Sequence, residues 1–208
     1  MTTEITVPAE MIAVLKLFAA VNDYRTYLNG IYLELGTNET RLTSTNGHIL
    51  GCFKVSSGHP TPTNVIIPLS LFKQVKQKGI VTLRIGEKRR VGRLVTVVYE
   101  DTSMAGVEIG GADDESYCQF PDYRKVIPKT VSGESAQLNL DYLTTIGKAC
   151  KILHGKNSCN SGGMGIGYNG QDSAIFNLGR PDDFIGVLMP LRIDAPTAAP
   201  EWAYLPTT

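Results

Sequence analysis

The stretch Ile5–Val21, ITVPAEMIAVLKLFAAV, sets the pattern that the rest of the chain repeats. Its first three residues are β-branched, which favours a strand. Pro8 follows and begins a helix well, because the missing N–H of proline costs nothing in a first helical turn. The residues after Pro8 are strongly apolar, as expected of a helix that packs into a core. The stretch therefore predicts a strand that leads directly into a buried helix.

The same order of elements recurs twice more along the chain. The first pass continues with strands predicted in YLNGIYLEL, ETRLTST and HILGCFKV. The second pass has the strand NVIIP, a helix over 68–79, and strands in VTLRIG, RLVTVVYED, MAGVEIG and SYCQF. The third has the strand AQLNL, a helix over 141–153 with Asp141 as its expected cap, and strands in GMGIGYN, SAIFNLG and FIGVLMPLRI. Three such passes predict an α+β fold of three βαβββ units, with the helices on one face of antiparallel sheets.

The composition narrows the possible functions. The chain has 208 residues, with 20 Lys and Arg against 20 Asp and Glu, so its formal net charge is zero. This balance argues against binding nucleic acid or membranes through bulk positive charge. No apolar run is long enough to span a membrane, and the first residues do not resemble a secretory signal. We therefore expect a soluble cytoplasmic protein without a membrane partner.

The residues that could support catalysis or metal binding do not form a recognisable set. The sequence contains no GxSxG, P-loop, HExxH or DxDxDG motif. Cys150 and His154 share one face of a predicted helix, and Cys159 is near, but a zinc site needs a fourth ligand and usually tighter cysteine spacing. Ordinary, partly buried side chains are the favoured interpretation. We expect no enzymatic activity, no cofactor and no bound metal.

The distribution of charge is more informative than its sum. Lys73 and Lys76 lie three residues apart in the second predicted helix, and Lys148 and Lys151 repeat this spacing in the third. The pairs are either solvated helix faces or parts of one surface directed at a polyanion. The segment RIGEKRRVGR, residues 84–93, predicts an exposed basic hairpin that contacts a DNA backbone or only aids solubility.

Four segments resemble one protein family. RTYLNGIYLEL from Arg25, TSTNGHILG from Thr43 and QFPDYRKVIPK from Gln119 resemble, in this order, the middle domain of the bacterial DNA polymerase III beta subunit, the sliding clamp. GVLMPLRI, from Gly186, is similar to the C-terminal strand of that family. The resemblance implies a sliding-clamp fold in which each domain contains two of the units, helices line a central hole and sheets form the rim.

The resemblance implies a non-enzymatic processivity factor that encircles double-stranded DNA. Lysines facing phosphates would attract DNA without reading its sequence, and enclosure would retain it. On this interpretation the DNA-facing residues are Lys73, Lys76, Lys148 and Lys151. The same resemblance implies a hydrophobic groove for linear peptides of the DNA polymerase and the clamp loader. Carried over by motif position, its residues are Thr45, Gly47, His48, Leu50, Pro121, Val126, Val187, Met189, Pro190, Leu191 and Arg192. The family usually has an acid and a base where this chain has Asn46 and Ile49.

The resemblance also implies a division of the chain. Residues 1–130 would form one complete clamp domain, 131–193 half of another, and 194–208 an irregular tail. Because half a domain would leave a sheet edge unpaired, we expect residues 134–193 to pair with a partner subunit in a homo-oligomer. The alternative is a clamp-derived protein-interaction module that binds partner peptides but does not encircle DNA.

Overall fold

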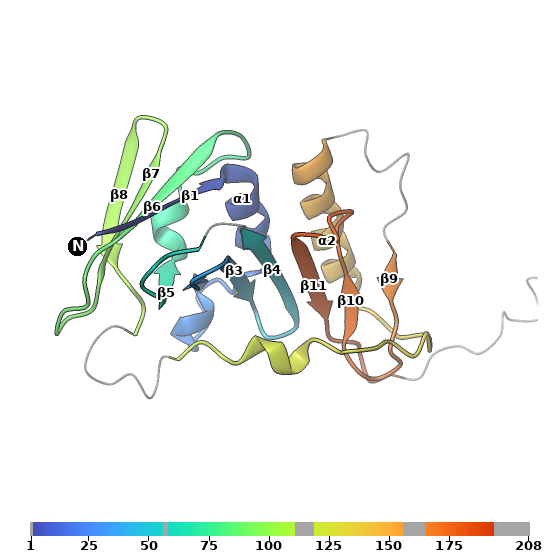
Figure 1. The fold of residues 1–208 in the computed structure, drawn as a ribbon. Coiled ribbons are helices and arrows are strands. Elements are labelled where there is room, and N and C mark those ends of the chain that lie inside the picture. Colours follow the sequence, from blue (N-terminus) through green and yellow to red (C-terminus); the bar gives the residue numbers. More distant parts are fainter. Residues whose placement is uncertain (1, 56–57, 111–118, 156–164, 194–208) are drawn as a thin grey trace, which may run out of the picture.

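The computed structural model describes residues 2–55, 58–110, 119–155 and 165–193. Its helices and strands, shown in Figure 1, follow the chain in this order: β1 (Thr3–Pro8), α1 (Ala9–Phe18), η1 (Thr26–Leu28), β2 (Gly30–Leu35), β3 (Thr40–Thr45), β4 (Ile49–Val55), β5 (Thr63–Pro68), η2 (Leu69–Phe72), β6 (Ile80–Ile85), β7 (Leu94–Tyr99), β8 (Thr102–Val107), η3 (Tyr123–Val126), α2 (Leu140–His154), β9 (Ile166–Gly167), β10 (Ala174–Phe176) and β11 (Phe184–Leu188). The elements labelled η are short 3-10 helices.

The strands form two antiparallel sheets. One has the order β1-β6-β7-β8 and the other the order β5-β2-β3-β4-β11-β10-β9. The first two units are interlocked, because β1 of the first unit pairs with β6 of the second while β5 of the second pairs with β2 of the first. The third unit continues the larger sheet through the pairing of β11 with β4. Antiparallel sheets with helices packed on them confirm the predicted α+β class.

Helix α1 forms the centre of the core. Pro8 ends β1 and is the N-cap of the helix, as the opening stretch predicts. Ile12, Leu15 and Phe18 are completely buried, because α1 packs against both the larger sheet and α2 (Figure 1). The apolar character of this helix therefore reflects contacts on several sides.

Two glycines face each other where the third unit joins the first. Gly51 of β4 and Gly186 of β11 are direct partners in the antiparallel register. Side chains at these positions would collide with aromatic rings, since a Cβ on Gly51 would lie 2.4 Å from Phe18 and one on Gly186 would lie 2.2 Å from Phe176. The missing side chains let Phe18, Phe176 and Phe184 pack over the junction with ring centroids 6.0 to 6.3 Å apart.

The helix predicted over 68–79 is wrong. The structure has only the four-residue η2, followed by a turn and irregular backbone. The ammonium group of Lys16 on α1 donates to the carbonyl oxygens of Phe72 at 2.9 Å and Val75 at 3.1 Å. In a continuous α-helix these two carbonyls would accept backbone N–H groups four residues later. A contact from another helix thus takes the place of the hydrogen bonds that would have extended η2.

Smaller differences concern the third unit. Helix α2 is capped by Asn139, not Asp141, because the side chain of Asn139 accepts the N–H of Asp141 at 2.8 Å. The strand expected in AQLNL is absent from the described residues, where Gln137 forms only an isolated bridge with Leu191. Most of SYCQF, and the tail 194–208, lie outside the described residues.

Candidate functional site

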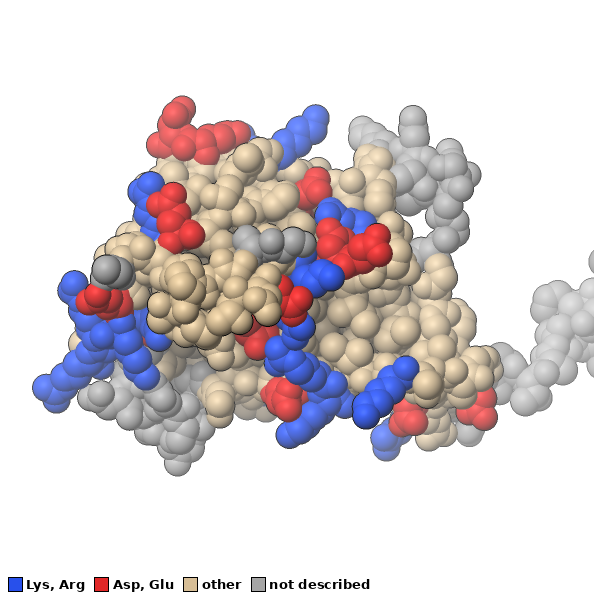
Figure 2. All heavy atoms as spheres, in the orientation of Figure 1, with Lys and Arg blue, Asp and Glu red and all other residues tan. Residues whose placement is uncertain are grey.

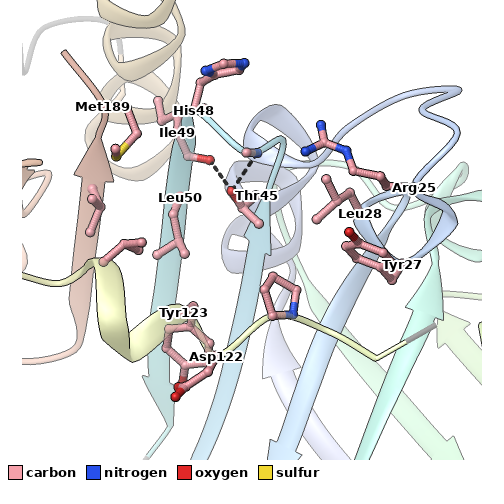
Figure 3. Close-up of a pocket in the computed structure, with 14 residues that line it drawn as sticks. Arg25, Tyr27, Leu28, Thr45, His48, Ile49, Leu50, Asp122, Tyr123 and Met189 are labelled. Carbon is pink, nitrogen blue, oxygen red and sulfur yellow. Dashed lines mark hydrogen bonds between the residues drawn. The ribbon is translucent and has the colours of Figure 1, made fainter. Parts of the chain in front are cut away.

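A pocket opens beside the junction of β4 and β11, between η1 and η3 (Figure 3). Its volume is about 240 Å³. The residues that line it come from segments far apart in the sequence: Arg25, Tyr27, Leu28, Thr45, Gly47, His48, Ile49, Leu50, Pro121, Asp122, Tyr123, Val126, Val187 and Met189.

The buried part of the pocket wall is apolar. Leu28, Leu50 and Val187 are each no more than 4% exposed. Leu50 and Val187 are register partners across the β4–β11 pair, so the sheet itself holds them side by side. At the rim, Val126 and Met189 are 39% and 38% exposed. The pocket therefore combines a fixed apolar surface with two accessible apolar side chains that a ligand could cover.

The turn between β3 and β4 forms one wall and is held by its own side chains. The hydroxyl of Thr45 donates to the carbonyl oxygen of Ile49 at 2.8 Å and accepts the N–H of Gly47 at 3.0 Å (Figure 3). The side chain of Asn46 accepts the N–H groups of His48 and Ile49 at 2.9 and 3.0 Å. Gly47 has a φ of +94°, a conformation that favours glycine. Asn46, where the family usually has an acid, thus stabilises the turn.

The side chain of His48 packs beside Tyr142 of α2, with ring centroids 6.1 Å apart and an interplanar angle of 19°. This contact connects the turn to the third unit. His48 is exposed and lies at the upper end of the pocket in Figure 3.

Arg25 supplies positive charge at the opposite rim. Asp23 orients it through a salt bridge of 2.9 Å, and Arg25 also donates to the carbonyl oxygen of Asn46 at 3.3 Å. The hydrogen bonds from Arg25 lower the pKa of Asp23 to about 2, so the carboxylate stays ionised over the physiological range. A Cβ on Gly47 would lie 3.1 Å from the Arg25 guanidinium, so glycine at this position also makes room for the arginine.

A third wall is the short helix η3. The hydroxyl of Tyr123 donates to a carboxylate oxygen of Glu34 at 2.5 Å, and Arg124 binds the same carboxylate at 2.9 Å. Burial raises the pKa of Tyr123, which keeps its hydroxyl protonated as the donor. These contacts attach η3 to β2 and thereby fix Pro121 and Val126 at the pocket.

The structure brings together eight of the eleven residues predicted for the groove. These eight are Thr45, Gly47, His48, Leu50, Pro121, Val126, Val187 and Met189. Pro190, Leu191 and Arg192 do not line the pocket, because the chain turns away after Met189 and the N–H of Leu191 binds the carbonyl oxygen of Gln137 at 2.7 Å.

The prediction missed several pocket residues, among them Arg25, Tyr27, Ile49, Asp122 and Tyr123. Each of them lies within one of the segments that carried the family resemblance, so the resemblance could have located them.

The four lysines predicted to face DNA are all exposed but belong to different kinds of element. Lys148 and Lys151 lie on α2 as expected. Lys73 is the C-cap of η2 and Lys76 lies in the irregular segment after it. The structure therefore contains one helical lysine pair, not two equivalent ones.

Within the described parts of the chain, no group of three or more His, Cys, Asp or Glu residues is placed to hold a metal ion. None of the described helices has the length and apolar character needed to cross a membrane.

The fold is that of a sliding clamp. The sliding clamp from Pseudomonas aeruginosa bound to griselimycin matches 92% of this chain with a TM-score of 0.64 and 16% identity, over 66% of its own length. The DNA polymerase III beta subunit from Thermotoga maritima also matches 92% of this chain, with a TM-score of 0.63 and 14% identity, over 66% of its length. At these identities the likeness concerns the fold alone.

The sequence comparisons find similarity to the same group of proteins over a shorter part of the chain. Residues 4–97 match the family described as DNA polymerase III beta subunit, central domain. The beta sliding clamp from Proteus mirabilis is 28% identical over 117 residues, which are 53% of this chain and 29% of that relative. The chain therefore matches less than a third of the curated clamp and about two thirds of the solved ones.

Proposed function

We propose that this protein is a sliding-clamp-like processivity factor of DNA replication whose pocket binds short peptide segments of a DNA polymerase and a clamp loader. The observation that carries the proposal is the pocket at the β4–β11 junction, with its apolar wall and charged rim. Leu50 and Val187 offer buried surface for one or two apolar side chains of a peptide. Met189 suits several partners, because its flexible thioether adapts to different shapes.

The polar rim would orient a bound peptide. Arg25 is fixed by Asp23 and can donate to a peptide carbonyl or carboxylate. Asp122 lies on the η3 side of the pocket and can accept from a peptide N–H. Such a site needs no catalytic group, in agreement with a non-enzymatic role.

Binding to this pocket can be tested with griselimycin, the ligand of the Pseudomonas aeruginosa clamp. Calorimetric titration of the full chain should give measurable binding. Met189→Asp should weaken it at least tenfold, because a charge would be buried against the apolar wall. Leu191→Asp is the matched control, since Leu191 is 39% exposed like Met189 at 38% but does not line the pocket. Equal effects of the two substitutions, or tight binding by Met189→Asp, would contradict the proposal.

Encircling double-stranded DNA is the second part of the proposal and requires several copies in a homo-oligomer. Lys148 and Lys151 on α2 support it, because exposed lysines on one helix face suit sequence-independent contact with phosphates. The proposed domains, over 1–130 and 131–193, would be the building blocks of that ring. The cytoplasm is the compartment in which it would act.

The alternative is a protein-interaction module that binds peptides without encircling DNA. The second unit favours this alternative, because only the short η2 follows β5 where an α-helix was expected, and Lys73 and Lys76 then share no α-helix face. Retention on nicked circular DNA after gel filtration separates the two proposals. A ring-forming protein should elute with circular DNA but slide off linearised DNA. The double variant Lys148→Glu with Lys151→Glu should no longer elute with circular DNA. The module should bind griselimycin equally well but show no preference for circles.

A further inference from the structure

Strand β8 is an open sheet edge of unusual composition. It pairs with β7 on one side, and no other strand of the described residues pairs with it on the other. Its sequence, TSMAGV, contains no charged residue and no proline. Natural proteins usually protect such an edge with lysine, proline or a bulge, because the unpaired N–H and C=O groups otherwise invite another strand. Within the described residues, none of these devices occurs along the six residues of β8.

Both faces of β8 are suited to a neighbouring strand. Met104 lies opposite buried Val97 of β7, so it continues the core face of the sheet, yet it is 36% exposed. On the outer face, Val107 is 49% exposed and lies opposite Leu94, which is 56% exposed. A strand added to β8 would cover apolar surface on each face of the sheet.

Opposite charges mark the two ends of β8. The turn before it contains Glu100 and Asp101, both exposed. The other end of β8 is next to the start of β7. That start follows a turn with three exposed basic residues, Lys88, Arg89 and Arg90, and one exposed acid, Glu87, so the turn has a net positive charge. Figure 2 shows acidic residues at the upper left, over the tip of the β7–β8 hairpin of Figure 1, and a cluster of basic residues at the lower left, where β6 turns into β7.

We propose that β8 pairs antiparallel with β8 of a second copy of this chain, forming a two-fold dimer with one continuous eight-stranded sheet. In this arrangement Ala105 lies at the two-fold axis, opposite Ala105 of the second copy, and Ser103 of each copy lies opposite Val107 of the other. The acidic turn of each copy therefore lies at the same end of the joined sheet as the basic turn of its partner, about three strand widths or roughly 14 Å away. Attraction acts at both ends of the interface, because the two-fold axis repeats it. A parallel pairing would bring like charges together, so the charges select the antiparallel orientation.

This surface is distinct from residues 134–193, which the sequence suggested for oligomerisation, and from the pocket. The proposal does not depend on the function proposed above. It predicts a dimer whether or not the protein binds griselimycin or DNA.

Charge reversal provides the test, with sedimentation velocity of the full chain as the readout. The unmodified protein should sediment as a dimer at micromolar concentration. Reversing the acidic turn (Glu100→Lys with Asp101→Lys) or the basic turn (Lys88→Glu, Arg89→Glu and Arg90→Glu) should weaken the dimer at least tenfold, because each end then carries like charges. An equimolar mixture of the two variants should form a heterodimer, since both ends are complementary again.

A second pair of variants tests the strand itself. Ala105→Lys places a lysine on the outer face at the centre of β8, where two copies would meet, and should abolish the dimer. Thr96→Lys is the matched control, because Thr96 is the register partner of Ala105 on the same face but one strand inside the edge. Circular dichroism of each variant verifies folding. A monomeric unmodified protein, a variant mixture that stays monomeric, or equal effects of the two lysines would overturn the proposal.

Discussion

Replacing Gly186 by alanine should weaken the junction between β4 and β11 by crowding the ring of Phe176. The new Cβ would lie 2.2, 2.3 and 2.6 Å from three carbon atoms of that ring. Carbon atoms in favourable contact are about 3.5 to 4.0 Å apart, so the ring would have to move by more than about 1 Å. Phe176 is only 3% exposed and packs against Phe18 and Phe184, which leaves little room for this movement.

Two opposing effects set the expected magnitude. Overpacking a well-packed core costs about 1 to 3 kcal/mol, and the ring contacts place this site near the upper limit. Alanine also restricts the unfolded chain, which returns about 0.5 to 1 kcal/mol. The net loss of unfolding free energy should therefore be about 2 kcal/mol, a factor of roughly 30 in the unfolding equilibrium.

Urea unfolding followed by far-ultraviolet circular dichroism measures this loss. With a typical dependence on urea, the midpoint should fall by about 1 M while the slope stays the same. Gly147→Ala is the control, because Gly147 lies inside α2 and a Cβ there meets nothing within 4 Å. That variant should be as stable as the unmodified protein or more stable by up to about 1 kcal/mol.

A double-mutant cycle identifies the ring as the cause. Phe176→Leu should cost less stability in the Gly186→Ala background than alone, because the smaller side chain removes the collision. Additive effects, or a Gly186→Ala protein as stable as Gly147→Ala, would refute the reasoning about this junction.

Three further predictions concern stability. Lys16→Met keeps the apolar stem but removes the ammonium group that binds two carbonyls after η2, so the free energy of unfolding should fall by about 2 kcal/mol in a urea titration. Arg180→Met removes the ion pair to Glu10 on α1, which connects the third unit to that helix, and the ion pair to Asp183 in the same loop. Thermal unfolding should therefore show a loss of about 1 kcal/mol in the free energy of unfolding. Burial raises the pKa of Glu108 despite its partner Arg93. Ionisation of Glu108 therefore lowers the free energy of unfolding as pH rises through the folded-state pKa. At pH 7, Glu108→Gln should have a higher urea midpoint than the unmodified protein. The difference should disappear below about pH 4, where this carboxyl group is protonated in both the folded and the unfolded state.

Much of the architecture follows from local pattern. The β-branched residues before Pro8 and the apolar run after it predicted β1 and α1 correctly, because both elements depend on residues close in sequence. The family segments predicted the larger part of the pocket, although Thr45 and Met189 are separated by most of the chain. That success came from resemblance to a known fold, since no local pattern relates residues so distant in sequence.

The sequence pattern thus determined the class of fold and most of the strands along the chain, and the family resemblance of its segments indicated which of them meet at the pocket. Only the tertiary structure decided which strands pair, where η2 ends and which residues after Met189 leave the pocket. The reason is that these features depend on contacts between distant residues. Lys16 binds carbonyls that a longer helix would have used, and Gly51 meets Gly186 because rings from other elements fill the space above them. A periodic pattern predicts which face of an element is buried, but the shape of the partner decides what can pack there.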